Sequence, residues 1–326
     1  MESSRPKALR NSSVEVLRIF FIVGIVMIHI YGHGSQLNVQ WIYSLGGDWA
    51  TAYHLSLFAL GKMGVTGFMF ISGLYGIRMN KMRWVSLLSM CVSYYIILSL
   101  IFGHYKGLIH VIHAWDCWWF LAVYLLICLF APLIDLGFER LKKESMLFIV
   151  AGLFIYTYVG HFLNMSNDHD VVILLTVYVF GRYISIYSPS LLWKNSEIIA
   201  ALSLSILVIV PIAIEMLFES FYLQRMFLNN NNPLLLVTAS ALVVSAYKHP
   251  TYCKFINWLA KSVLAIYLIL EWPEIRDHFN TYALPRVIDG WGLLLIPIAV
   301  IICVMIESLR RWMYEKLTQF FVSKYQ

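Results

Sequence analysis

Charged residues are scarce in this chain of 326 residues: they make up 13% of it, whereas hydrophobic residues make up 60%. The mean hydropathy is +0.72. So few charges cannot cover the surface of a soluble domain of this length, which excludes the soluble globular classes. The sequence also lacks an internal repeat, a long polar linker and an appended polar domain. We therefore expect a single integral membrane domain over residues 1–326.

Cysteine is rare too, with five residues and no CxxC or Cys/His spacing. This pattern excludes a disulfide framework and gives no indication of a metal site, so we expect no metal and no tightly bound cofactor. A cleaved signal peptide is not predicted either. Glu15 and Arg18 lie within the first apolar run, and no Ala-x-Ala pattern follows it.

Long apolar stretches are what the chain does contain. Backbone polar groups in lipid must be bonded within their own segment, and continuous apolar runs favour helices over the alternating strands of a barrel. We predict an all-α polytopic membrane helix bundle of about ten transmembrane helices. The expected spans are 14–30, 53–77, 84–103, 118–134, 146–163, 171–187, 197–218, 233–247, 256–270 and 290–309.

The placement of Lys and Arg gives an independent test of this topology, because short cytoplasmic loops collect basic residues. With the N-terminus inside, eighteen basic residues in or beside the loops are assigned to the cytoplasmic side and four to the outside, and Arg18 and Lys62 are left within spans. Both termini are therefore predicted to be cytoplasmic. The net charge of +6 is explained by this topology and by anionic lipid, so it gives no argument for a nucleic-acid partner.

The first span carries the most informative pattern, because Arg18 and His29 are eleven positions apart. At about 100° per residue this spacing places both side chains on nearly the same helical face, roughly 16 Å apart along the axis. Glu15 precedes Arg18 by three positions and can pair with it. Ionisable groups within a span usually face a cavity and mark a function. The alternative is that Glu15 and Arg18 anchor the helix at the interface, with His29 a polar residue at its far end.

Five segments resemble the acyltransferase-3 family of membrane acyltransferases. The R-x10-H spacing of the first span is similar to that family's opening helix, and GVTGFMFISGLYG, with Ser72 and Gly73, resembles its second span. The basic stretch that follows, the Trp119-Phe120-Leu121 pattern closing at Pro132, and AKSVLAIYLI complete the resemblance, which covers nearly the whole chain.

The resemblance implies transfer of an acyl group, usually acetyl from acetyl-CoA, to a hydroxyl of a cell-surface or lipid-linked glycan. A sugar hydroxyl is a poor nucleophile near neutral pH, so a general base is needed, and we expect His29 to supply it with Glu15 and Arg18 as the other catalytic residues. Basic side chains at the inner end can hold the donor phosphates. The expected donor-binding residues are Arg18, Ser72, Arg78, Lys81 and Arg83, although the last three also fit a role as topology signals.

Acceptor-binding candidates lie toward the predicted outer side. His113 and Asp116 precede Trp119 near a span mouth, and aromatic side chains suit sugar rings, although aromatic belts give the same composition. Glu271 stands where the resembled family often has a histidine. It can serve as an acid or an orienting carboxylate, or it can be a polar residue of the outer interface. The Asn229 to Asn232 run predicts an exposed loop.

The expected partners are the lipid bilayer, acyl-CoA and a glycan acceptor, and the sequence contains no indication of oligomeric state. We expect the protein to be located in a bacterial cytoplasmic (inner) membrane. The main alternative function is a transporter of glycans or lipid-linked sugars, which would need many spans and buried Arg or His but no CoA site.

Overall fold

The computed structural model describes residues 10–32, 48–103, 107, 117–159, 171–220, 223, 227–288 and 291–324. All regular secondary structure in these ranges is helical, which confirms the predicted all-α class. The long helices are α1 (Ser12–Gly32), α3 (Asp48–Tyr75), α4 (Lys81–Ile101), α5 (Trp119–Arg140), α8 (Val171–Tyr187), α9 (Ser190–Phe218), α11 (Pro233–Lys248), α14 (Pro273–Ile288) and α15 (Leu295–Lys324). The shorter ones are α6 (Lys143–Phe154), the π-helix η2 (Ile155–Val159), α12 (Lys254–Leu259), η3 (Ala260–Ser262), α13 (Val263–Leu270) and η4 (Gly292–Leu294).

Six described helices are long and apolar enough to cross a bilayer: α1, α3, α4, α5, α9, and α15 together with η4. A seventh crossing results if the helices from α12 to α14, which bend by 89° at a short break, form one span. The apolar helices α8 and α11 are shorter. Each of the ten expected segments coincides at least in part with a helix. The count of ten crossings stays a prediction, and so does the cytoplasmic location of both termini.

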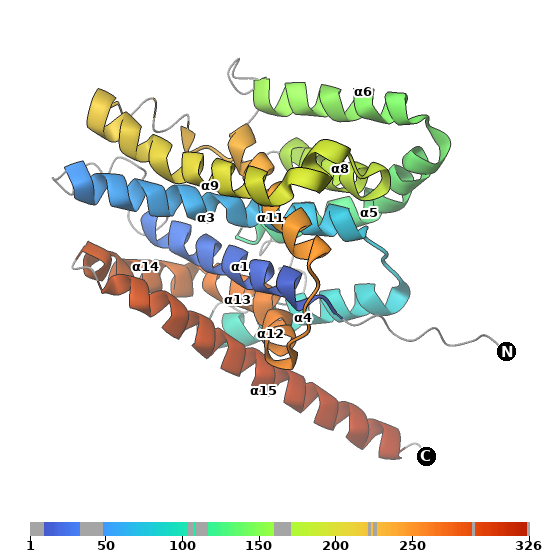
Figure 1. Ribbon diagram of the computed structural model, residues 1–326. Helices are drawn as coiled ribbons and strands as arrows, with labels where there is room; N and C mark the ends of the chain where they lie inside the picture. Colours follow the sequence, from blue (N-terminus) through green and yellow to red (C-terminus); the bar gives the residue numbers. More distant parts are fainter. Residues whose placement is uncertain are drawn as a thin grey trace.

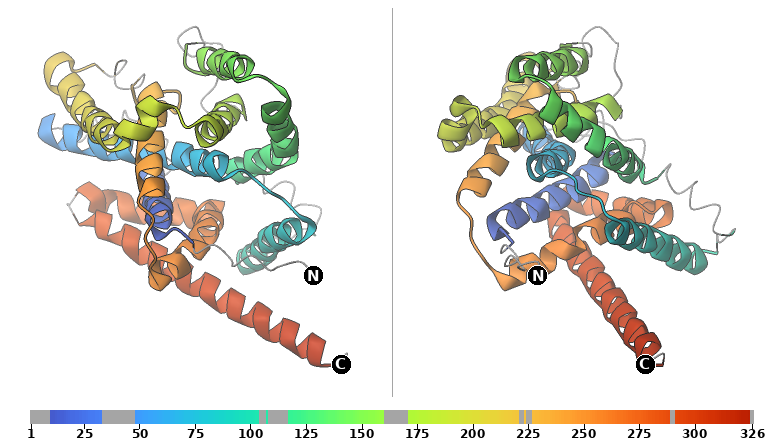
Figure 2. Two further views of the ribbon diagram at one scale, coloured as in Figure 1. Left: turned by 45° about the vertical axis from the view of Figure 1, so that its right-hand side comes forward. Right: turned by 90° about the vertical axis from the view of Figure 1, so that its right-hand side faces the viewer.

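Helix α1 lies between two groups of helices, with α3 on one side and α13, α14 and α15 on the other (Figure 1). Two further views agree with this placement, and they show α1 beginning and α15 ending toward the same end of the bundle (Figure 2). A hydrogen bond from Arg311 to Ser262 Oγ and another from Ser12 Oγ to Asn257 join the neighbouring elements there. We call this the basic end, because it carries Arg10, Arg83 and Lys261.

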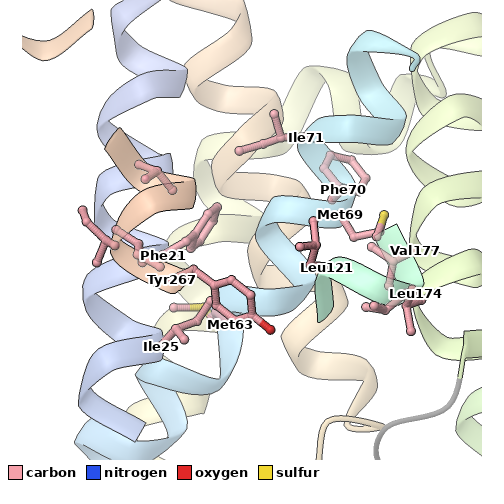
Figure 3. Packing of buried hydrophobic residues seen from close by; sticks show 14 of the residues in the cluster. Phe21, Ile25, Met63, Met69, Phe70, Ile71, Leu121, Leu174, Val177 and Tyr267 are labelled. Carbon is pink, nitrogen blue, oxygen red and sulfur yellow. The ribbon is translucent and has the colours of Figure 1, made fainter. Parts of the chain in front are cut away.

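Glycines set the close approach of α1 and α3. A Cβ atom at Gly61 would come within 2.7 Å of the Gly24 carbonyl oxygen, and one at Gly64 within 2.6 Å of the Phe21 carbonyl oxygen. Small residues allow this approach where lipid supplies no hydrophobic driving force between helices. The buried side chains of Phe21, Ile25 and Met63 fill the space beside this crossing (Figure 3). The face of α1 that carries Arg18 is thereby held in a fixed register against α3.

The Asn229 to Asn232 run is a loop, as predicted, but the prediction that it is exposed is wrong. Asn231 is buried, and Asn230 accepts a hydrogen bond from Lys62, a residue near the middle of α3. Asn232 caps α11, because its side-chain oxygen accepts a hydrogen bond from the backbone of Leu234. These asparagines satisfy backbone and side-chain groups at a helix start that lies against α3, which is why they are not at the surface.

Candidate active site

One face of α1 carries the candidate site. Arg18, Ile22, Ile25 and His29 follow one another at spacings of four, three and four residues, the repeat of a single helical face. The first three of these residues line a cavity, and His29 continues the row one turn further along. The predicted alignment of Arg18 with His29 on one helix face is therefore confirmed.

Glu15 lies between two arginines at the basic end. One of its oxygens accepts a hydrogen bond of 2.7 Å from Arg10, and the other lies 3.4 Å from Arg18. The Glu15 residue is only 4% exposed, so it is not a surface anchor. The Arg18 side chain is 30% exposed and faces the cavity. The carboxylate thus fixes the guanidinium of Arg18 while leaving part of it accessible to a ligand.

The cavity has a volume of about 340 Å³ and lies between α1, α3, α4, α5 and the segment from η3 to α13. Its basic end is lined by four cations, namely Arg10, Arg18, Arg83 and Lys261. The rest of the lining is mainly apolar, apart from Ser72, Tyr124 and Tyr267: Ile22, Ile25, Phe68, Met79, Leu87, Phe120, Leu121, Ala260, Val263 and Leu264. Such an arrangement suits a ligand with anionic groups at one end and a less polar remainder.

The structure brings together three of the five expected donor-binding residues. Arg18, Ser72 and Arg83 line the cavity. Arg78 and Lys81 do not line it; both are exposed, and the Arg78 carbonyl oxygen accepts a hydrogen bond from the Arg83 side chain. Arg83 lies in the first turn of α4, where its backbone N–H donates to the side chain of the N-cap residue Asn80, and its side chain lines the cavity.

Sequence reasoning missed Arg10 and Lys261, which it counted only as basic loop residues. Both line the cavity beside Arg18 and Arg83. Within the described part of the chain, Glu15 is the one carboxylate in ion-pair contact with any of these four cations. The basic end of the cavity therefore carries a surplus of positive charge. No spacing in the sequence could have indicated this cluster, because it assembles from three separate segments.

His29 and Glu271 form a buried acid and base pair. His29 Nε2 lies 2.7 Å from Glu271 Oε1, and the side chains are 12% and 3% exposed. Arg276 lies further away, with its guanidinium 3.9 Å from the other carboxylate oxygen. The interpretation of Glu271 as a polar residue of the outer interface is therefore wrong. It occupies the break between α13 and α14, which turns its side chain toward α1 rather than toward the surface.

One helical turn separates the cavity from this pair on both of its helices. Ile25 lines the cavity four residues before His29, and Tyr267 lines it four residues before Glu271. The Tyr267 hydroxyl accepts a hydrogen bond from the backbone N–H of Phe120, and the two rings pack edge to face. The close-up shows Ile25 and Tyr267 among the packed side chains beside α1 (Figure 3). These aromatic and aliphatic groups form the boundary between the cavity and the His29–Glu271 pair.

The other acceptor candidates stay predictions. His113 and Asp116 lie outside the described residues. Trp119 is half-buried at the first position of α5 and packs edge to face on Phe120, and it does not line the cavity. Of the four expected acceptor residues, only Glu271 is seen in contact with His29.

A comparison with protein-family models finds a match over residues 11–308, to the model Acyl_transf_3, described as an acyltransferase domain. This range contains the His29–Glu271 pair and all the residues that line the cavity except Arg10. No curated protein and no solved structure matches the chain.

Proposed function

Because the chain belongs to the acyltransferase-3 family, and is thus an integral membrane acyltransferase, we propose that it moves an acetyl or similar acyl group from acyl-CoA to a glycan hydroxyl. The acceptor is a cell-surface or lipid-linked glycan, and the membrane is the bacterial cytoplasmic membrane. The donor enters from the cytoplasm at the basic end. The acceptor approaches from the opposite side, where His29 is located.

One observation carries the proposal, namely a cationic cavity that ends one turn short of a buried histidine and carboxylate pair. Coenzyme A has phosphates at one end and a long, weakly charged pantetheine arm that ends in sulfur. If twelve bonds of this arm are fully extended, they match the length of four extended residues and span roughly 14 Å. Arg18 and His29 are roughly 16 Å apart along α1. With its phosphates near Arg18, the donor has an arm long enough to bring the thioester close to His29.

The charges of the cavity suit the donor phosphates. Arg18 and Arg83 offer guanidinium groups, which bind phosphate oxygens in a bidentate manner, and Lys261 adds a point charge. Arg10 shares Glu15 with Arg18 and lines the same entrance. Ser72 lies further in, where its hydroxyl donates to the Phe68 carbonyl within its own helix. We assign the four cations to the phosphates and Ser72 to the arm.

The His29–Glu271 pair supplies the base. The imidazole accepts the proton of the acceptor hydroxyl as its oxygen attacks the thioester carbon, and it then returns that proton to the departing CoA thiolate. Glu271 orients the ring and stabilises the imidazolium that forms between the two steps, as a buried carboxylate does in other acid and base pairs. The thioester can reach His29 only when the boundary formed by Ile25, Phe120 and Tyr267 opens.

Membranes that contain this protein should transfer radiolabel from [1-14C]acetyl-CoA to a glycan, and membranes without it should not. Mass spectrometry of the surface polysaccharide with and without the protein then identifies the modified hydroxyl. Labelled glycan in equal amounts from both membranes would contradict the proposal. A glycan or lipid-linked sugar that crosses the membrane in a protein-dependent way, with no acylation, would favour the transporter instead.

A further inference from the structure

Trp272 directly follows Glu271 at the break between α13 and α14, where the helix axis bends by 89°. Its side chain is deeply buried, with an exposed fraction of 6%. The indole packs against two other aromatic rings, those of Tyr95 and Trp118, at centroid distances of 6.2 and 6.0 Å. Broken helices within membrane bundles commonly form binding sites, because their ends present polar groups away from lipid.

The indole N–H of Trp272 is buried, yet no acceptor in the described part of the chain lies in hydrogen-bonding geometry to its Nε1 atom. Buried donors are normally bonded, and leaving one unbonded is unfavourable. The neighbouring Trp118 shows the ordinary case, because its N–H donates to the Leu268 carbonyl oxygen at 3.2 Å. The two indoles are in contact, but among the described residues only the N–H of Trp118 has an acceptor.

We propose that the partner of the Trp272 N–H is the carbonyl oxygen of the transferring acyl group. This inference rests on the proposed function. The residue adjoins Glu271, whose carboxylate contacts the base His29, so it belongs to the segment that the thioester must reach. A buried donor that no described residue bonds is available for an oxygen that becomes negatively charged during the reaction.

Acyl transfer then passes through an oxyanion. The acceptor oxygen forms a bond to the thioester carbon while His29 takes its proton, and the electron pair of the carbonyl bond moves to the oxygen. Trp272 donates to this oxyanion. The electron pair on the oxyanion then re-forms the carbonyl bond, the carbon–sulfur bond breaks, and the CoA thiolate takes the proton from His29.

The test compares Trp272→Phe with Trp118→Phe, both of which keep an aromatic ring and remove an N–H. Both variants lose ring volume at a buried site, so both should be destabilised, but Trp272→Phe should lower the unfolding temperature less than Trp118→Phe does, because no hydrogen bond to the described residues is lost with its N–H. Its turnover with radiolabelled acetyl-CoA should fall 10²- to 10³-fold, the usual effect of losing an oxyanion donor, while the KM for acetyl-CoA stays the same. Trp118→Phe should lower the unfolding temperature, because the Leu268 carbonyl loses its partner.

Three results would overturn the inference: wild-type turnover per folded molecule in Trp272→Phe, a loss confined to KM, or a fall in unfolding temperature as large as that of Trp118→Phe. The last result would mean that the N–H bonds to the protein itself. Failure of the proposed function is seen separately, as wild-type membranes that form no labelled product, and it removes the oxyanion role as well.

Discussion

At the residue scale, the candidate site depends on how a few charges are shared. Glu15 contacts both Arg10 and Arg18, so neither guanidinium is fully neutralised, and Arg83 and Lys261 add charge at the same entrance. Lys81 lies two residues from Arg83 but does not line the cavity, although both residues are exposed. The positive-inside rule counts the two residues equally, so the cavity lining is what assigns Arg83 to ligand binding and Lys81 to membrane topology.

Replacing Arg18 with Ala should abolish transfer while the protein stays in the membrane, because an accessible charge is lost and no packed core is removed. Arg83→Ala and Lys261→Ala should each weaken the binding of acetyl-CoA about tenfold, the usual scale for one charge-assisted contact. The measurement is the Kd of acetyl-CoA for the detergent-solubilised protein. Lys81→Ala is the matched control, and weakening there as large as in Arg83→Ala would refute the assignment.

His29→Ala should lower turnover on the order of 10²-fold or more, the usual contribution of a general base, without changing the Kd of acetyl-CoA. Glu271→Gln should lower turnover too, because an amide cannot stabilise the imidazolium as a carboxylate does. These effects are measured as single-turnover rates. Normal turnover in His29→Ala would exclude His29 as the base.

The periodicity of α1 was sufficient to align Arg18 with His29, because both belong to one helix and helical geometry fixes their relation. It could not reveal the contact between His29 and Glu271. That contact depends on a bend between α13 and α14 and on how the bend packs against α1, which are tertiary properties. Without them, a carboxylate after an apolar run looks like an interface residue.

At the element scale, the glycine crossing of α1 and α3 determines where the site residues stand. Phe21 and Ile25 of α1 lie very close to Gly64 of α3. A Cβ atom at Gly64 would lie 2.6 Å from the Phe21 carbonyl oxygen and 2.6 Å from the Ile25 Cγ1 atom. Ile25 also lines the cavity, one turn below His29. A shift of α1 at this crossing therefore moves the boundary of the cavity and the base together.

Gly64→Ala should destabilise the protein by about 1–3 kcal/mol and lower turnover, because the added methyl group overpacks the crossing. Gly137→Ala is the control, since a Cβ atom at that helical position of α5 meets nothing within 4 Å. It should be neutral or stabilising by up to about 1 kcal/mol, the difference in helix propensity between the two residues. Thermal unfolding and turnover are measured for both. A Gly64→Ala protein as stable and active as Gly137→Ala would mean that the crossing is not tightly packed.

Hydropathy predicted the helices well where they are apolar along their length, as in α1, α3 and α9. It did not predict α14, whose sequence PEIRDHFNTYALPRVI is too polar to be recognised as a span. This helix contacts α1 and carries the chain away from Glu271. The missed element is the one that places the carboxylate, so the fold was easier to predict than the site.

At the scale of the whole molecule, the basic end collects the start of α1, the entrance of the cavity and the Arg311–Ser262 contact between α15 and η3. The positive-inside rule predicts that this end is cytoplasmic. A reporter fused after Gln326 should then be active only in the cytoplasm, and one fused after Glu219, at the end of α9, only outside. The reverse activity of both fusions would show that the protein is inserted the other way.

The account's central claim is that a donor bound at the basic end delivers its acyl group to the His29–Glu271 pair further along α1, so that the two substrates approach from opposite faces. Sealed vesicles of both orientations, given radiolabelled acetyl-CoA outside, test this most directly. Inverted vesicles should label glycan in their lumen, and right-side-out vesicles should label none. Inverted vesicles of Arg18→Ala should also label none, and those of His29→Ala should label more slowly, by on the order of 10²-fold or more. Equal labelling in both orientations, or labelling by the two variants at the wild-type rate, would contradict the claim.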